Sequence, residues 1–101
     1  MIQHTVSFRP NEGADVDTLL ARAADLAAID GVRDFTILNQ VGHKADYTHA
    51  LSMYFATQDD YDTYNAHPDH VAFVNDVWIP TVADFIELDY VAAFPGHAGR
   101  V

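Results

Sequence analysis

Six regular segments follow one another along the 101 residues in an order that few folds accommodate. Four of them alternate apolar and polar residues at period two, which is typical of β-strands with one buried face. These predicted strands span 2–9, 32–41, 47–56 and 84–93. Apolar residues at helical spacing predict one helix over 16–30 and a second, broken helix over 58–66 and 68–79. The order β-α-β-β-α-β predicts an α+β, ferredoxin-like monomer with an antiparallel four-stranded sheet and helices on one face.

Local signals predict where the helices begin and end. Asp15 is placed to cap the first helix, and Gly31 follows its last turn, where a left-handed residue is common. The residue before a proline is disfavoured in helical geometry, so His67 should interrupt the second helix. Pro68 suits the first position of a new helix, and Pro80 is expected to end it.

A chain of this length forms one domain, which we expect at 1–93, followed by a C-terminal tail at 94–101. Half of the residues are hydrophobic, as in globular proteins. The sheet face turned away from the helices should carry small or partly apolar side chains. These are Thr5, Ser7, Ala50, Ser52 and Tyr54. Such a face is best covered by a second sheet, so the sequence predicts a homodimer.

The charge balance narrows the classes of partner. Fifteen acidic residues oppose five basic ones, for a formal charge of −10. Repulsion disfavours nucleic acid and anionic membrane surfaces. The absence of cysteine excludes thiol catalysis and cysteine-based zinc sites. Neither a signal-like start nor a long apolar run stands out, so we expect a cytoplasmic protein without membrane association.

Five residues are candidates for chemistry. His4 and His49 fall on strand faces that are otherwise apolar, where each either lines a pocket or is a core histidine held by one hydrogen bond. Tyr64, His67 and His70 surround the predicted helix break. An imidazole can remove a proton next to a carbonyl while a phenol stabilises the developing oxyanion. In the alternative interpretation His67 caps a helix, Tyr64 packs in the core and His70 lies on the surface.

A metal site is a third interpretation of the same region. His67 and His70 are three residues apart, and further ligands would have to come from other segments. The available ones are His43, His49, Asp46 and Asp69. The spacing does not match a zinc motif such as His-Glu-x-x-His. We therefore predict neither a metal nor another cofactor.

Three motifs in order resemble the stress-responsive A/B barrel family, also called the dimeric α/β-barrel or Dabb domain. They are His4-Thr-Val-x-Phe8, Tyr47-Thr-His49-x-Leu51 and Tyr64-x-x-His67-Pro68-x-His70-Val71-x-Phe73. Gly31-Val32 and Asp89-Tyr90 fit the same pattern. The resemblance implies a ferredoxin-like monomer whose sheet packs on that of its partner to close a dimeric α/β barrel.

The resemblance also implies a site. One branch of the family is similar to the plant polyketide cyclases that form olivetolic acid by aldol condensation, where a tyrosine and a histidine of the third motif are catalytic. Here these are Tyr64 and His70, with His4, His49 and His67 as substrate-binding residues. The expected ligand is a small, largely apolar carbonyl compound in a cavity within the monomer. The expected activity is that of a cofactor-independent cyclase, lyase or isomerase, and the alternative is a non-catalytic, stress-related structural or ligand-binding dimer.

Overall fold

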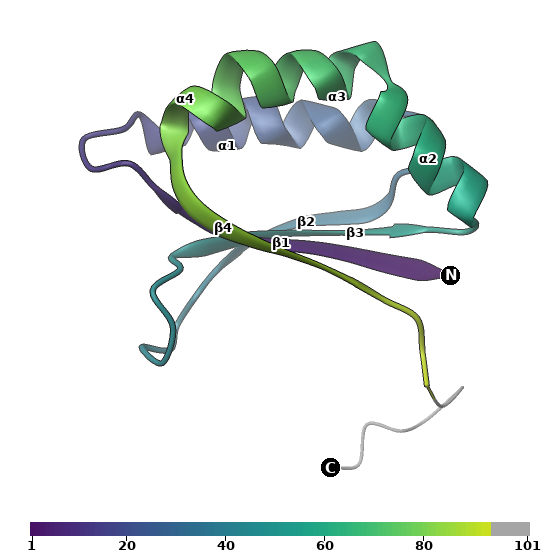
Figure 1. Cartoon of the computed structure of the whole chain (residues 1–101), viewed down its shortest axis with the longest axis horizontal. Coiled ribbons are helices and arrows are strands. Elements are labelled where there is room, and N and C mark those ends of the chain that lie inside the picture. The colour runs from purple at the N-terminus through teal and green to yellow at the C-terminus, as the bar shows by residue number, and fades with distance from the viewer. Residues whose placement is uncertain (94–101) are drawn as a thin grey trace.

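The computed structural model describes residues 1–93, which form an antiparallel sheet covered on one face by helices (Figure 1). The strands are β1 (Ile2–Pro10), β2 (Arg33–Asn39), β3 (His49–Phe55) and β4 (Val82–Tyr90). The helices are α1 (Val16–Ala24), α2 (Gln58–Ala66), α3 (Pro68–Phe73) and α4 (Ile79–Thr81). A 3₁₀ turn, Asp25–Ala28, extends α1, and a π-helical turn, Val74–Trp78, joins α3 to α4. The predicted tail at 94–101 lies outside the described residues.

The sheet has the order β2-β3-β1-β4, and all three pairings are antiparallel. This is the ferredoxin-like arrangement, so the predicted fold class is confirmed. Central β1 sets the register on both sides: His4 lies opposite Met53 of β3 and Asp89 of β4. Four residues further along, Phe8 lies opposite His49 of β3.

The core lies between the sheet and the helices. Residues that alternate along β1 and β3 face inward, and Phe8, Met53 and Phe55 are essentially inaccessible to solvent. The helices supply the facing layer, in which Leu19 and Tyr64 are the largest fully buried side chains. Period-two and helical apolar patterns therefore meet in one hydrophobic core, as the sequence predicts.

The predicted helix starts are confirmed by side-chain caps. Asp15 accepts a hydrogen bond from the Thr18 amide at 3.1 Å. His67 ends α2 in extended geometry, and its Nδ1 accepts from the Asp69 amide at 3.1 Å, which starts α3. The chain therefore turns between α2 and α3 at the predicted His67-Pro68 break.

The predicted end of the last helix is wrong. Pro80 lies inside α4, which continues to Thr81, so β4 begins at Val82 rather than at 84. A proline inside a helix lacks a donor, and its ring collides with the carbonyl four residues earlier. The π-helical turn directly before α4 widens the backbone at this point. In addition, Asn11 Nδ2 donates to the Pro80 carbonyl at 3.2 Å.

The other sheet face has no helix over it in the described part of the chain (Figure 1). Leu38, Ile86, Leu88 and Tyr90 lie on this face with 42–49% of their surface exposed. An apolar patch of this kind marks an interaction surface. None of the helices in the described part of the chain is long and apolar enough to span a membrane.

A side chain at position 31 would be disfavoured both by the backbone conformation of Gly31 and by a close contact with α2. Its φ is +92°, and a Cβ there would come within 3.2 Å of the Asp60 Cβ in α2. Gly13 also has a positive φ, +78°, but open space around it. We expect Gly13→Ala to lower the free energy of unfolding by about 1 kcal/mol and Gly31→Ala by about 2 kcal/mol. Urea denaturation of both variants measures the difference, and equal losses would show that the contact with Asp60 adds nothing.

Candidate functional site

A cavity of about 420 Å³ lies between the sheet and the helices that follow the His67-Pro68 break. Its apolar wall includes Val6, Leu51, Met53, Phe73, Trp78 and Phe85. Its polar groups come from His4 of β1, Tyr64 and Asn65 of α2, His70 of α3 and Glu87 of β4. A mostly apolar cavity with a few convergent polar groups is typical of a site for a small organic ligand.

His70 is held in one tautomer. Its Nδ1 lies 3.1 Å from the Asn65 carbonyl oxygen, which can only accept, so Nδ1 carries the proton. Nε2 of the neutral ring is then left with its lone pair. Burial lowers the pKa of His70 below its usual 6.5, although the bond to Asn65 opposes this shift. The ring is therefore neutral at pH 7 and has the form that a general base requires.

Tyr64 lies beside this imidazole. The two ring centroids are 4.4 Å apart, and Tyr64 is only 2% exposed. Burial, followed by the nearby Glu87 carboxylate, raises the pKa of Tyr64 well above 10, so the phenol keeps its proton. Its hydroxyl makes no hydrogen bond to another residue in the described chain. The phenol is therefore a free donor for a ligand oxygen.

His4 belongs to a second group, in which its Nδ1 is hydrogen-bonded. Its Nδ1 donates to Asp89 Oδ1 at 2.6 Å, because a carboxylate only accepts. The Tyr61 hydroxyl lies 2.9 Å from the same Nδ1 and donates to both Asp89 oxygens at 2.9 and 3.0 Å. Burial and then Asp89 raise the pKa of Tyr61, so this phenol also stays protonated. The His4 Nε2 lies 3.7 Å from Glu87 Oε1.

A family model described as the Stress responsive A/B Barrel Domain matches residues 2–92, almost the whole described chain. The chain belongs to this family. A curated relative is a stress-response A/B barrel domain-containing protein of Arabidopsis thaliana, 28% identical over 97 residues. The match covers 91% of this chain but 37% of the Arabidopsis protein, so the chain spans little more than a third of that relative's length.

Solved structures agree with the family assignment. A Dabb protein with a ferredoxin-like fold from Mesorhizobium loti is 44% identical, with a TM-score of 0.88, and covers 92% of this chain and 97% of its own. A dimeric ferredoxin-like protein of unknown function from Thermobifida fusca has 24% identity and a TM-score of 0.77, over 90% of each chain. The hydroxynitrile lyase of Passiflora edulis has 21% identity and a TM-score of 0.82, over 93% and 96%. The last two likenesses concern the fold alone.

The Dabb fold brings three of the five candidate residues together. His4, Tyr64 and His70 line the cavity. His49 is outside it: the ring stacks on Phe8 at a centroid distance of 5.6 Å, and its Nδ1 is bonded to the Thr48 hydroxyl. His67 caps α3, as the alternative interpretation of this residue expects. Roles for His49 and His67 in binding a substrate stay predictions.

Three residues in or beside the site, Tyr61, Glu87 and Asp89, were not predicted from the sequence. Glu87 and Asp89 reach the helix face because their positions in β4 pair with Val6 and His4 of β1. Tyr61 lies one helical turn before Tyr64 and also packs inward. The sequence signals for these residues are the i, i+3 spacing of the two tyrosines, the i, i+2 spacing of the two carboxylates and the fit of Asp89-Tyr90 to the family pattern.

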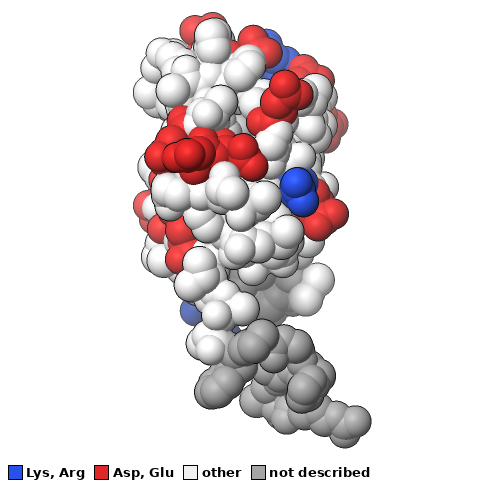
Figure 2. Space-filling view, turned by 90° about the vertical axis from the view of Figure 1, so that its right-hand side faces the viewer, with Lys and Arg blue, Asp and Glu red and all other residues white. Residues whose placement is uncertain are grey.

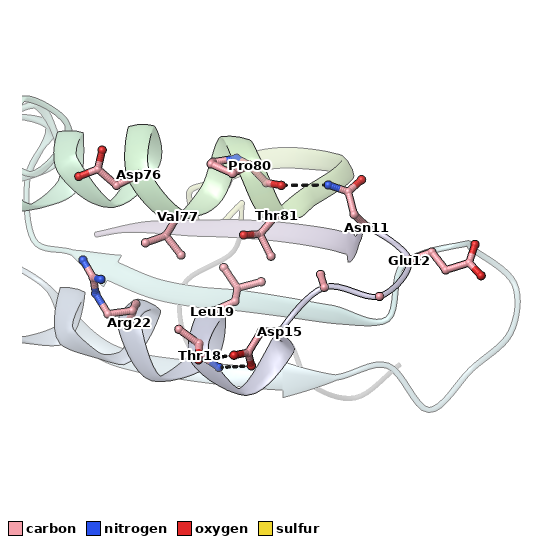
Figure 3. Close-up of a pocket in the computed structure, with 12 residues that line it drawn as sticks. Asn11, Glu12, Asp15, Thr18, Leu19, Arg22, Asp76, Val77, Pro80 and Thr81 are labelled. Carbon is pink, nitrogen blue, oxygen red and sulfur yellow. Dashed lines mark hydrogen bonds between the residues drawn. The ribbon is translucent and has the colours of Figure 1, made fainter.

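A second hollow of about 450 Å³ lies between the start of α1 and the end of α4 (Figure 3). Its lining includes Asp15, which caps α1, and Arg22 and Asp76. None of the five candidate residues contributes to it. Within residues 1–93 there is also no group of three or more His, Asp or Glu side chains arranged to hold a metal ion. The first cavity is therefore the candidate site of this Dabb domain.

Burial of His70 predicts a pH-dependent stability. Its pKa is lower in the folded chain than the value of 6.5 in the unfolded one, so acid protonates the unfolded state first. The folded state therefore loses stability as the pH falls below about 6.5 toward the lowered pKa. In urea denaturation between about pH 8 and 5, the free energy of unfolding should fall less steeply with pH for His70→Gln than for the wild type. The matched control is His43→Gln in an exposed loop, and equal slopes for His70→Gln and wild type would contradict the prediction.

Proposed function

We propose that this Dabb domain binds a small, largely apolar carbonyl compound in the cavity and promotes its enolisation. The observation that carries the proposal is the pairing of His70 and Tyr64 on one apolar cavity, with ring centroids 4.4 Å apart. One ring offers a free imidazole lone pair and the other a protonated phenol. Base and oxyanion donor are the two groups that enolate chemistry needs.

In the proposed reaction, Nε2 of His70 removes a proton from the carbon next to the carbonyl. The electrons of the broken C–H bond form the enolate, and the Tyr64 hydroxyl donates to its oxygen. The enolate then either takes the proton back from His70, at the same carbon or at a conjugated one, or attacks a second carbonyl within the ligand. In the second case the carbonyl π electrons form an alkoxide, which takes the proton from His70 and restores the neutral base. The outcomes are isomerisation and aldol-type cyclisation, and neither needs a redox partner.

The surroundings of the pair support a largely apolar ligand without negative charge. Apolar side chains form most of the cavity wall, and the overall charge of −10 opposes polyanionic ligands. A protein of this fold from Passiflora edulis is named as a lyase, so the fold accommodates catalysis in at least one relative. That likeness carries no residue role to this chain.

Proton exchange tests the proposal without a known substrate. β-Tetralone, a small ketone with exchangeable α-protons, is incubated with the protein in D₂O, and deuterium uptake is followed by NMR. We expect faster uptake than in buffer or with a heat-denatured sample. Binding of β-tetralone without faster deuterium uptake would favour the non-catalytic ligand-binding dimer. If the protein neither binds β-tetralone nor speeds the uptake, the proposal is overturned.

We further propose that the domain works as a homodimer in which two sheets face each other. The open face carries partly exposed Leu38, Ile86, Leu88 and Tyr90. A single four-stranded sheet cannot close into a barrel, whereas two sheets packed face to face cover both apolar surfaces. The Thermobifida fusca protein of the same fold is described as dimeric, which supports this assembly.

A further inference from the structure

One carboxylate of the cavity has no partner at hydrogen-bond distance in the described chain. Glu87 lies on β4 opposite Val6, and its side chain is 48% exposed. Its nearest basic atom, His4 Nε2, is 3.7 Å away, beyond the range of a hydrogen bond. Asp89 and Tyr61 already hold the other nitrogen of that imidazole at 2.6 and 2.9 Å. Glu87 is therefore not needed to orient His4.

His4 lies between two carboxylates, Glu87 in the cavity lining and Asp89 at the other ring nitrogen. Even a positively charged imidazole would offset one of these two charges and leave a net negative charge. The described lining of the cavity contains no Lys or Arg that would balance it.

Aromatic rings face the same space. Trp78 and Phe85 line the cavity with ring centroids 5.6 Å apart, and Tyr64 lies on the helix side. A cation held over aromatic rings gains from their quadrupoles, and more so when it leaves water. Aromatic rings next to a free carboxylate are the surroundings that bind organic ammonium groups.

Charge outside the cavity acts in the same direction. Figure 2 shows the end of the molecule that carries α2, where Asp and Glu side chains far outnumber Lys and Arg. The start of α2 contributes Asp59 and Asp60 to this charge. A field of this sign draws cations toward the protein and repels anions.

We propose that Glu87 is a specificity-determining residue that selects ligands with a protonated amine. The inference rests on the proposed function in that it uses the same cavity. The substrates would then be aminated, largely apolar carbonyl compounds. In this arrangement the ammonium group binds Glu87 while the carbonyl lies between Tyr64 and His70. Ligands with a carboxylate or phosphate are excluded by the same charge.

Two probes of similar shape separate charge from fit. Benzylamine is a cation at pH 7, and benzyl alcohol is neutral. Binding is followed by NMR shifts of the Tyr64 and His70 signals. We expect the wild type to bind benzylamine roughly two- to fivefold more tightly, the range for an ion contact at a half-exposed site. Glu87→Gln should remove this preference and leave the affinity for benzyl alcohol unchanged.

The matched control is Glu12→Gln, because Glu12 is the other glutamate of the chain and lies at the second hollow. Glu12→Gln removes the same charge and should keep the preference for benzylamine over benzyl alcohol. Glu87→Asp keeps the charge and should retain most of the preference for benzylamine. This variant keeps the inference testable if Glu87→Gln does not fold. Equal affinities of the wild type for both probes, or an unchanged preference in Glu87→Gln, would overturn the inference and leave the proposed function standing. Failure of both probes to shift the Tyr64 and His70 signals would also overturn the inference, whereas the proposed function is decided separately by deuterium uptake into β-tetralone.

Discussion

Tyr64→Phe slows deuterium uptake into β-tetralone by roughly 10²–10³-fold relative to the wild type, the loss expected when one oxyanion donor is removed. The effect is this large because, in the proposed reaction, the Tyr64 hydroxyl beside the His70 base donates to the enolate oxygen. The phenylalanine ring keeps the packing against Phe55, whose centroid lies 5.1 Å away. The rate of exchange at pH 7 is the measurement.

A second tyrosine provides the control. Tyr47 precedes β3 and does not line the cavity, so Tyr47→Phe makes the same chemical change elsewhere. The Tyr47→Phe variant should promote deuterium uptake into β-tetralone at the wild-type rate. Thermal unfolding of both variants separates loss of chemistry from loss of structure. If Tyr64→Phe is stable and exchanges at the wild-type rate, the phenol is not the oxyanion donor and the assigned role is wrong.

His70 gives the pH dependence of the same rate. Because burial lowers its pKa, the neutral base persists to a lower pH than a free histidine would allow. Exchange should therefore stay constant through pH 7 and fall only as the pH drops through the lowered pKa.

The sequence predicted which face of each central strand is buried, but not the position of a residue along that face. His4 and His49 both lie among apolar residues at period two, and both face the helices. Register decides the rest: His4 pairs with Met53, whereas His49 pairs with Phe8, four residues further along β1. The first imidazole reaches the cavity and the second does not. Register depends on pairing between distant segments, which one strand's own pattern does not contain.

β4 shows why the acidic residues of the site were missed. Its apolar members, Ile86 and Leu88, alternate with Glu87 and Asp89. Hydrophobic patterning alone places the apolar set toward the core. In the structure Ile86 and Leu88 face away from the helices instead, because the register with β1 turns the two carboxylates toward the helices. The pattern fits the proposed homodimer, in which the second sheet would also bury the outer face of β4.

Leu88→Asp is therefore expected to dissociate the proposed homodimer. Leu88 is 43% exposed at the open face of the sheet, where a second sheet would cover it. A buried, unpaired carboxylate costs several kcal/mol, and a two-fold axis introduces two of them into one interface. Sedimentation velocity should give a dimer for the wild type and the mass of one chain, 11.2 kDa, for the variant.

Val71→Asp is the matched control for this substitution. Val71 lies on α3, on the helix side of the sheet, and is 44% exposed, almost the same as Leu88. The same charge at this position should leave the dimer intact, because the proposed interface is on the opposite face. A dimer that survives Leu88→Asp, or a wild type that sediments as a monomer, would contradict the sheet-to-sheet assembly. The exposed apolar residues of β4 would then need another partner, since Ile86, Leu88 and Tyr90 together leave an apolar row 42–49% exposed on the open face.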